Sequence, residues 1–129
     1  MKKIIPLLFI FFVSAYLFVS KNHCSNVKAK IYSINNKNYC LLTASNQEQW
    51  QKGLMFYKKP VDFDGMIFIF PDRQIRSFWN KNTYVDLDLY WMNGEKVVGK
   101  SSLLSIENSK KVVIVGSKVK VDRVVELIK

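Results

Sequence analysis

The sequence predicts a mainly β fold, an antiparallel β-sandwich or barrel-like single domain with one short helix, preceded by an N-terminal hydrophobic helix. Three observations support this fold class. About eight short β-prone runs follow one another, turn signals separate them, and no helices alternate with the strands. The 129 residues leave room for one domain, and a hydrophobic content of 49% is enough to form its core.

Residues 1–20 are expected to be an export signal or a membrane anchor. Lys2 and Lys3 precede an apolar run that extends, with one Ser-Ala interruption, over residues 4–20. This run reaches the lower limit of the roughly 17–25 residues that a membrane-spanning helix needs, and we favour a retained anchor. The lysines would then stay in the cytoplasm, with the domain outside at the cell membrane. Cleavage would instead release a secreted protein.

A polar stalk, residues 21–26, is predicted to lead into the domain at residues 27–129. The stalk contains Cys24, and the second cysteine is Cys40. An exported protein can form disulfides, but a bridge between these two cysteines would require the stalk to fold back on the domain. We therefore expect two free thiols, or an intermolecular contact through Cys24.

The first elements of the domain are a hairpin and a helix. Two β-prone runs in residues 27–44 flank the turn cluster Asn-Asn-Lys-Asn, which predicts a β-hairpin. A helix of about two turns follows. Ser45 and Glu48 are interpreted as its capping box, Gly53 as its end, and Trp50 as its anchor in the core.

The remaining elements are strands. Residues 64–70, DGMIFIF, are apolar at both odd and even positions, which is typical of a central strand covered on both faces. Pro71 is expected to end this strand. The pair Asn93-Gly94 is a strong hairpin signal. Five further strands are predicted, at residues 75–81, 85–92, 95–104, 110–116 and 121–128.

Apolar and polar residues alternate along residues 85–92. A half-buried strand turns successive side chains to opposite faces. We therefore expect burial of Leu87, Leu89 and Trp91, and a wetter environment for Asp86 and Tyr90.

The predicted domain lacks the common catalytic and cofactor sites. The single histidine, His23, precedes it, which excludes Ser-His-Asp and Cys-His pairs within the domain. A zinc site would have to combine His23 with Cys24 and Cys40 at poor spacing, and no phosphate-binding or dinucleotide motif is present. Asp62 and Asp64 lack the further ligands of a calcium loop and are interpreted as turn residues. We expect no metal and no cofactor.

A candidate site lies between two predicted strands, at Lys81, Asn82 and Thr83. An Asn-Thr pair there can close the turn through side-chain bonds to the backbone. The same run can also present an ammonium, an amide and a hydroxyl to a small polar ligand, with Trp79 and Trp91 as an aromatic wall. Both interpretations stay open.

Asp86 and Asp88 form a second candidate site. They are two residues apart on a strand, so both carboxylates face the same side with Cβ atoms about 7 Å apart. A carboxylate pair at such a distance can cleave a glycosidic bond. Two acids on the wet face of an edge strand give the same pattern, and Lys81 is as readily their salt-bridge partner.

Charge says little about partners. The formal net charge is +10, and most of it comes from lysines spread along the chain. No nucleic-acid-binding motif is present, and an exported protein would not meet genomic DNA, so we expect no nucleic-acid partner. The lysine-rich surface is suited to weak attraction by anionic lipid or cell-wall polymer.

Three sequence runs together resemble a known family. In order and spacing, QKGLMF at residues 51–56, DGMIFIF at 64–70 and SFWNKNTYVDLDLYWMNGEKVV at 77–98 are similar to the bacterial and archaeal family known as domain of unknown function 192. The ending VDRVVELIK resembles the family's Val-Leu-Glu strand, and the resemblance covers residues 28–129. It implies a β-sandwich-like domain, often behind a signal or anchor, and no activity.

The resemblance also implies which positions belong to the family motif. The matching polar positions are Lys81, Asn82, Thr83 and Asp88, with Gly53, Met55, Gly65 and Trp79 as framework. On this basis Asp88 is expected to be partly buried and bonded to backbone N–H groups, to Lys81 or to Thr83.

The chain departs from the family pattern at several places. Tyr57 replaces a usual arginine, Asn80 a methionine and Asp86 a proline. Family members usually continue beyond the Val-Leu-Glu strand, so this domain, which stops at Lys129, is expected to be C-terminally shortened.

These observations favour a binding function over catalysis. We expect a membrane-anchored accessory module outside the cytoplasm, which binds a small polar or glycan ligand, or an envelope protein, through Trp79, Lys81, Asn82, Thr83 and Asp88. One alternative is a hydrolase of envelope glycans that uses Asp86 and Asp88. Another is a purely structural domain that docks on a membrane protein.

Overall fold

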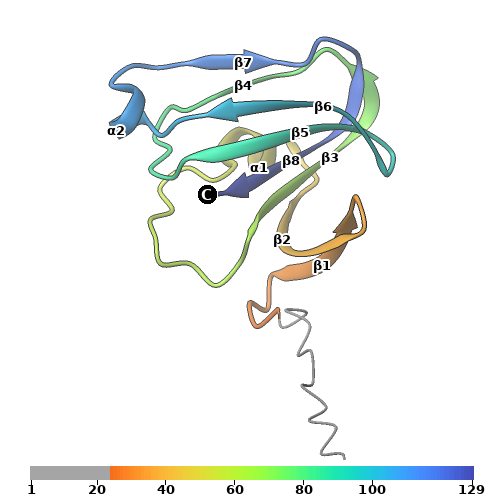
Figure 1. The fold of residues 1–129 in the computed structure, drawn as a ribbon, viewed down its shortest axis with the longest axis horizontal. Helices are drawn as coiled ribbons and strands as arrows, with labels where there is room; N and C mark the ends of the chain where they lie inside the picture. Colours follow the sequence, from red (N-terminus) through yellow and green to blue (C-terminus); the bar gives the residue numbers. More distant parts are fainter. Residues whose placement is uncertain (1–23) are drawn as a thin grey trace, which may run out of the picture.

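Eight strands and two short helices make up residues 24–129, the part of the chain that this computed structural model describes (Figure 1). Six strands form one curled sheet in the order β1-β2-β3-β8-β5-β6, and β4 pairs with β7 in a second sheet. The predicted mainly β, barrel-like fold is confirmed, and the sheet closes about half a barrel. The elements are β1 (Ala29–Ile34), β2 (Lys37–Ala44), α1 (Gln47–Lys52), β3 (Gly65–Gln74), β4 (Ser77–Trp79), β5 (Leu87–Asn93), β6 (Lys96–Leu103), α2 (Ile106–Ser109), β7 (Ile114–Gly116) and β8 (Val121–Ile128).

The predicted N-terminal helix lies outside the described residues. Within residues 24–129, neither helix has the length and apolar character needed to cross a bilayer.

The hairpin of β1 and β2 forms where the sequence predicts it. Asn35 and Asn36 connect the strands with φ angles of 51° and 62°. Asparagine tolerates this left-handed conformation better than most residues, and a two-residue hairpin loop of type I′ needs it at both positions.

Helix α1 begins one residue later than expected. Its N-cap is Asn46, whose side chain accepts a hydrogen bond from the backbone N–H of Gln49. Gln49 in turn accepts from the N–H of Ser45, so the predicted capping box of Ser45 and Glu48 is wrong. Gly53 ends the helix as predicted, and the half-buried Trp50 packs against the core.

Strand β3 differs from the prediction in two ways. It pairs with β2 in parallel, because α1 and the loop after it return the chain to the end of the sheet at which β2 begins. It also continues through Pro71 to Gln74, although Pro71 was expected to end it. The pairing of β3 with β8 is irregular between Ile69 and Gln74, and proline, which lacks an N–H, is tolerated at such irregularities.

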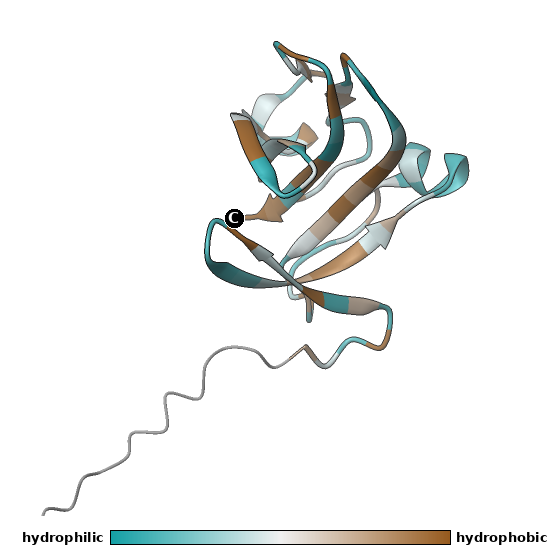
Figure 2. Cartoon of the chain, turned by 90° about the vertical axis from the view of Figure 1, so that its right-hand side faces the viewer, coloured by the Kyte–Doolittle hydropathy of each residue, from teal (hydrophilic) through white to brown (hydrophobic). Residues whose placement is uncertain are grey.

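The central position of β3 is confirmed. Its neighbours are β2 and β8, and its side chains enter two apolar clusters on opposite faces of the sheet. Phe68 lies in the larger cluster with Leu89 and Trp91, and Ile67 lies in the smaller one with Val125. Apolar residues run along the strands of the curled sheet in Figure 2.

The alternation along β5 is also confirmed. Leu87, Leu89 and Trp91 are buried, and Asp86, Asp88 and Tyr90 on the opposite face are half-buried. Gly94 begins the two-residue turn to β6 with a φ of 54°. The sequence analysis did not find α2, which Ser105 caps by accepting from the N–H of Asn108.

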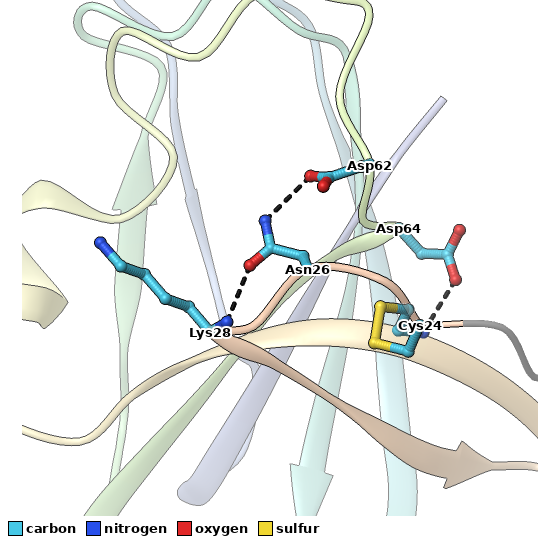
Figure 3. The surroundings of a disulfide bond; sticks show 6 residues. Cys24, Asn26, Lys28, Asp62 and Asp64 are labelled. Atoms are coloured by element: carbon cyan, nitrogen blue, oxygen red, sulfur yellow. Dashed lines mark hydrogen bonds between the residues drawn. A yellow bond between two sulfur atoms is a disulfide. The ribbon is translucent and has the colours of Figure 1, made fainter.

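Residues 24–26, the described part of the predicted stalk, fold back on the domain. Cys24 and Cys40 form a disulfide with Cα atoms 5.3 Å apart, so the expectation of free thiols is wrong (Figure 3). The side-chain amide of Asn26 donates to Asp62 over 2.9 Å, and Asp64 accepts from the backbone N–H of Cys40 over 2.8 Å. Both aspartates therefore fix loops, as a turn interpretation requires.

Candidate functional site

The run of Lys81, Asn82 and Thr83 closes a turn. Asn82 has a φ of 51°, and its carbonyl accepts from the backbone N–H of Phe56 over 2.9 Å. Thr83 is buried, and its hydroxyl donates to the carbonyl of Lys81 over 3.2 Å. The exposed Lys81 extends over the ring of Trp79, with its Nζ 5.2 Å from the ring centroid. Asn82 therefore has the turn-closing role that was one of the two interpretations of this run.

Asp88 lies apart from this turn. Its carboxylate faces Lys100 at 3.9 Å and Lys129 at 3.6 Å, and it accepts a long hydrogen bond from Ser102. It bonds neither Lys81 nor Thr83, so the predicted partners of Asp88 are wrong.

Asp86 instead has the structural role that was expected of Asp88. Its carboxylate accepts a 2.7 Å hydrogen bond from the backbone N–H of Ser105 and a 2.8 Å hydrogen bond from the side-chain amide of Asn108. These bonds hold the pKa of Asp86 below its usual range, the backbone bond from Ser105 first. Neither Asp86 nor Asp88 lines a cavity that we describe, and Asp86 is committed to α2.

A cavity of about 860 Å³ lies between α1, the turn after it, β3 and β4. Trp79 and Thr83 are the two predicted site residues that line it, and Gly53 and Met55 of the family framework also contribute. Its aromatic lining consists of Trp50, Phe56, Phe68, Phe70, Phe78 and Trp79.

The aromatic lining is held by ring-to-ring contacts. Phe78 packs edge-on against Phe68, with centroids 4.9 Å apart, and against Trp91 at 5.7 Å. Trp50 lies 5.0 Å from Phe70. Such edge and tilted contacts are favourable geometries for aromatic pairs. The rings therefore hold one another in place along the cavity.

Arg76 lines the same cavity with its charge already compensated. Its guanidinium stacks 3.6 Å from the centroid of Phe70. It donates to the carbonyl of Val121 over 3.0 Å and to both the carbonyl and the carboxylate of Asp72. The sequence analysis did not single out Arg76.

Glu126, on β8, is the residue that stands out chemically. It is 4% exposed, lines the cavity, and makes no side-chain hydrogen bond or ion pair within residues 24–129. Burial raises the pKa of its carboxyl to about 8, so at neutral pH the group is mostly protonated. Glu126 is not among the site residues predicted from the sequence, although a lone acid in the apolar run VVELI was a usable signal.

Metal ligands do not gather in the described residues. Residues 24–129 contain no group of three or more His, Cys, Asp or Glu side chains that could hold an ion. The polar lining of the cavity consists of the buried or half-buried Glu126, Arg76 and Thr83 and the exposed Glu48, Gln51, Lys52 and Ser77.

Two solved structures resemble this fold. A proposed transcription regulator from Sinorhizobium meliloti is 23% identical, with a TM-score of 0.60 over 78% of this chain and 78% of its own. A protein of unknown function from Novosphingobium aromaticivorans is 19% identical, with a TM-score of 0.63 over 78% of this chain and 73% of its own. At these identities the likeness shows the fold alone. No curated protein matches the sequence.

A family model matches nearly all of the folded domain. The model DUF192, described as an uncharacterized ACR, aligns with residues 30–129. The match spans the Gly-Leu-Met run, the β3 motif, the run from Ser77 onward and the strand that carries Glu126. The chain belongs to the DUF192 family.

Proposed function

We propose that this chain is a binding module outside the cytoplasm, held at the membrane by residues 4–20, that takes a small ligand into the cavity between α1, β3 and β4. The observation that carries the proposal is the carboxyl of Glu126, which lies in an aromatic cavity and has no partner within residues 24–129. Small-molecule sites are mostly apolar clefts of about 300–1,000 Å³ with a few polar groups that fix orientation. The cavity matches that description in its volume of about 860 Å³ and in its lining.

The unpaired carboxyl supports a ligand rather than a stabilising role. A buried polar group without a partner costs free energy of folding. An apolar residue at position 126 would fill the same wall without that cost. A ligand that forms a hydrogen bond or ion pair with the carboxyl would offset this free-energy cost. Ligand binding therefore explains why an acid stands at position 126.

The binding residues differ from those expected from the sequence. Trp79 and Thr83 remain in the proposed site, and Glu126 is added. Lys81 acts at the rim by lying over Trp79, and Asn82 shapes the turn. Asp88 is left out, because neither it nor its partners Lys100 and Lys129 line the cavity.

The disulfide supports the proposed location. Disulfides persist in oxidising compartments and are rare in the cytoplasm, and Cys24 pairs with Cys40 close to the predicted anchor. With Lys2 and Lys3 inside, a retained helix over residues 4–20 would place this disulfide just outside the membrane.

Ligand-observed NMR tests the binding function. The full-length chain in detergent is mixed with sugars, amines, amino acids and small carboxylates. We expect at least one class to bind, and binding to be lost in Trp79→Ala. Val98→Ala is the control, because Val98 is exposed on β6 and does not line the cavity. Absence of any binder, or binders that are indifferent to Trp79→Ala, would show that the cavity is not a ligand site.

Fractionation tests the location separately. After alkaline extraction of membranes the chain should stay in the pellet, and protease added to intact spheroplasts should digest the domain. Release into the medium would mean that the segment is a cleaved signal. Full protection from external protease would place the domain inside the cell and refute this part of the proposal.

An envelope protein that inserts a side chain into the cavity is the alternative occupant. Phe56, Ile75 and Trp79 line the cavity and are 62%, 56% and 46% exposed. Large apolar residues gathered on one rim are typical of a protein contact. A photo-crosslinker at Ile75 discriminates between the two occupants, because a single cross-linked protein that is lost in Trp79→Ala favours the alternative.

A further inference from the structure

We infer that the ligand of this cavity carries a positively charged nitrogen, an organic ammonium group that lies against the aromatic rings and pairs with Glu126. This inference rests on the proposed ligand-binding function of the cavity and names the chemical class of the ligand.

The other buried or half-buried polar groups of the lining already have hydrogen-bond or ion-pair partners. The indole N–H of Trp50 donates to the carbonyls of Ala44 and Ile69. The hydroxyl of Thr83 donates to a backbone carbonyl, and Arg76 is paired with Asp72 and Val121. The carboxyl of Glu126 is therefore the buried polar group of the lining that can still form hydrogen bonds. In its ionised form a carboxylate accepts hydrogen bonds and binds cations.

The aromatic rings favour the same ligand. The face of an aromatic ring is electronegative and attracts cations. Two rings of the lining already hold a cation of the chain itself, since Arg76 stacks on Phe70 and Lys81 lies over Trp79. Arg76 and Lys81 cover the faces of Phe70 and Trp79, so a ligand would lie against the other rings of the lining. A neutral ligand could bond only the protonated carboxyl of Glu126, whereas a cation can also use the charge of its ionised form.

Within residues 24–129, no cationic side chain pairs with Glu126. Its cross-strand neighbours are Met66 on β3 and Leu89 on β5, both apolar. The charged side chains that line the cavity are Glu48 and Lys52 on α1 and Arg76 after β3, and within residues 24–129 none of them forms an ion pair with Glu126.

Pairing with an ammonium group is linked to a proton. Because burial raises the pKa of Glu126 to about 8, the empty cavity holds the neutral acid at neutral pH. An ammonium ligand favours the ionised form, so the carboxyl releases its proton to solvent as the cation enters. Binding should therefore release about one proton per ligand near pH 6.5, and affinity should rise up to about tenfold per pH unit below pH 8.

Matched pairs of small molecules test the inference. Choline is compared with its neutral isostere 3,3-dimethylbutan-1-ol, and phenethylammonium with 2-phenylethanol, by calorimetry on the full-length chain in detergent. Each cation should bind about tenfold or more tightly than its neutral counterpart. Two buffers of different ionisation enthalpy should report the released proton, a readout that needs no variant.

Two variants locate the effect. Glu126→Gln keeps the size of the side chain and should abolish both the preference for cations and the proton release. Glu95→Gln removes an exposed carboxylate in the turn between β5 and β6, outside the cavity, and should leave both unchanged. Phosphatidylcholine vesicles form a separate arm. Binding to vesicles but not to free choline would identify a lipid headgroup as the source of the cation.

The outcomes separate the two proposals. Equal binding of cation and neutral isostere, or binding of sugars alone, overturns the ammonium inference and leaves the cavity as a ligand site. Cation binding without proton release, or unchanged in Glu126→Gln, also overturns it. If no ammonium probe binds in either arm, the inference fails, and the mixed library described above decides the fate of the cavity as a ligand site independently.

Discussion

The carboxylate of Asp86 accepts a 2.7 Å hydrogen bond from the backbone N–H of Ser105, 19 residues later in the chain. This bond and those from Asn108 join the start of β5 to the cap of α2. Asp88, two residues along, makes only ion pairs of 3.6–3.9 Å with lysines and a long hydrogen bond. Two acids that look equivalent in the sequence therefore differ in what their removal should cost.

Asp86→Ala should lower the free energy of unfolding by roughly 1–3 kcal/mol, because it leaves the N–H of Ser105 and the amide of Asn108 without their acceptor. Asp88→Ala should lower it by about 0.5 kcal/mol or less, as is usual for solvent-screened ion pairs. Urea unfolding of both variants measures the difference. Near-equal losses of unfolding free energy in the two variants would contradict the role of Asp86 in joining the start of β5 to the cap of α2.

The sequence predicts the opposite roles for these two aspartates. Asp88 was expected to be partly buried because it matches the family motif, and Asp86 was expected to be wetter because it lies on the polar face of the alternating strand. The partners of Asp86 lie on α2, and no local pattern in the sequence reveals that α2 packs against the start of β5. The alternation of Leu87, Leu89 and Trp91, by contrast, needs only the period of a strand and was predictable.

The same limit explains the other differences. Turn and strand signals are local, so the hairpin at Asn35 and Asn36 and the central strand β3 were predictable. The Cys24–Cys40 disulfide and the parallel pairing of β3 depend on where distant segments meet. The lone acid in the apolar run VVELI could have drawn attention to Glu126, but only the packed structure shows that its carboxyl has no partner within residues 24–129.

Asn80 is a second residue whose role depends on distant contacts. It is fully buried, and its amide donates to the carbonyls of Leu104 and Lys111 and to the hydroxyl of Ser109. Its side-chain oxygen accepts from the N–H of Val113 over 2.7 Å. Asn80→Ala would leave these groups buried without partners, and we expect a loss of roughly 2–4 kcal/mol in unfolding free energy.

The control for Asn80 is its neighbour Lys81, which is exposed. Lys81→Ala should change stability by about 0.5 kcal/mol or less. Thermal unfolding followed by circular dichroism compares the two variants. If Lys81→Ala proves as destabilising as Asn80→Ala, the turn depends on the contact of Lys81 with Trp79 rather than on the buried amide.

The disulfide should account for a large part of the stability of the domain. It joins residues 16 positions apart, and a closed loop of that length stabilises by about 3 kcal/mol in the chain-entropy model. We expect reduction, or the joint change of Cys24→Ala and Cys40→Ala, to lower the free energy of unfolding by this order. Urea unfolding with and without dithiothreitol measures it, and the reductant should not affect the double variant.

Glu126 should make the domain less stable as the pH rises. The pKa of its carboxyl is about 8 in the folded state against an ordinary value of 4.5, so between these values the folded state binds more protons than the unfolded state. Stability that is present below about pH 4.5 is therefore lost with rising pH, by up to about 1.4 kcal/mol per pH unit, until about pH 8. Glu126→Gln cannot ionise and should show no such loss.

Urea unfolding at several values between about pH 5 and pH 8 compares the wild type with Glu126→Gln. The lowered pKa values of Asp72 and Asp86 act below about pH 4, outside this window, and every variant keeps them. Glu48→Gln, at the exposed side of the same cavity, should retain the wild-type decline. The two stability profiles should meet near the acid end and separate toward pH 8, with Glu126→Gln the more stable. Parallel profiles would show that water or a counter-charge already compensates the carboxyl, and the case for a cationic ligand would lose its electrostatic basis.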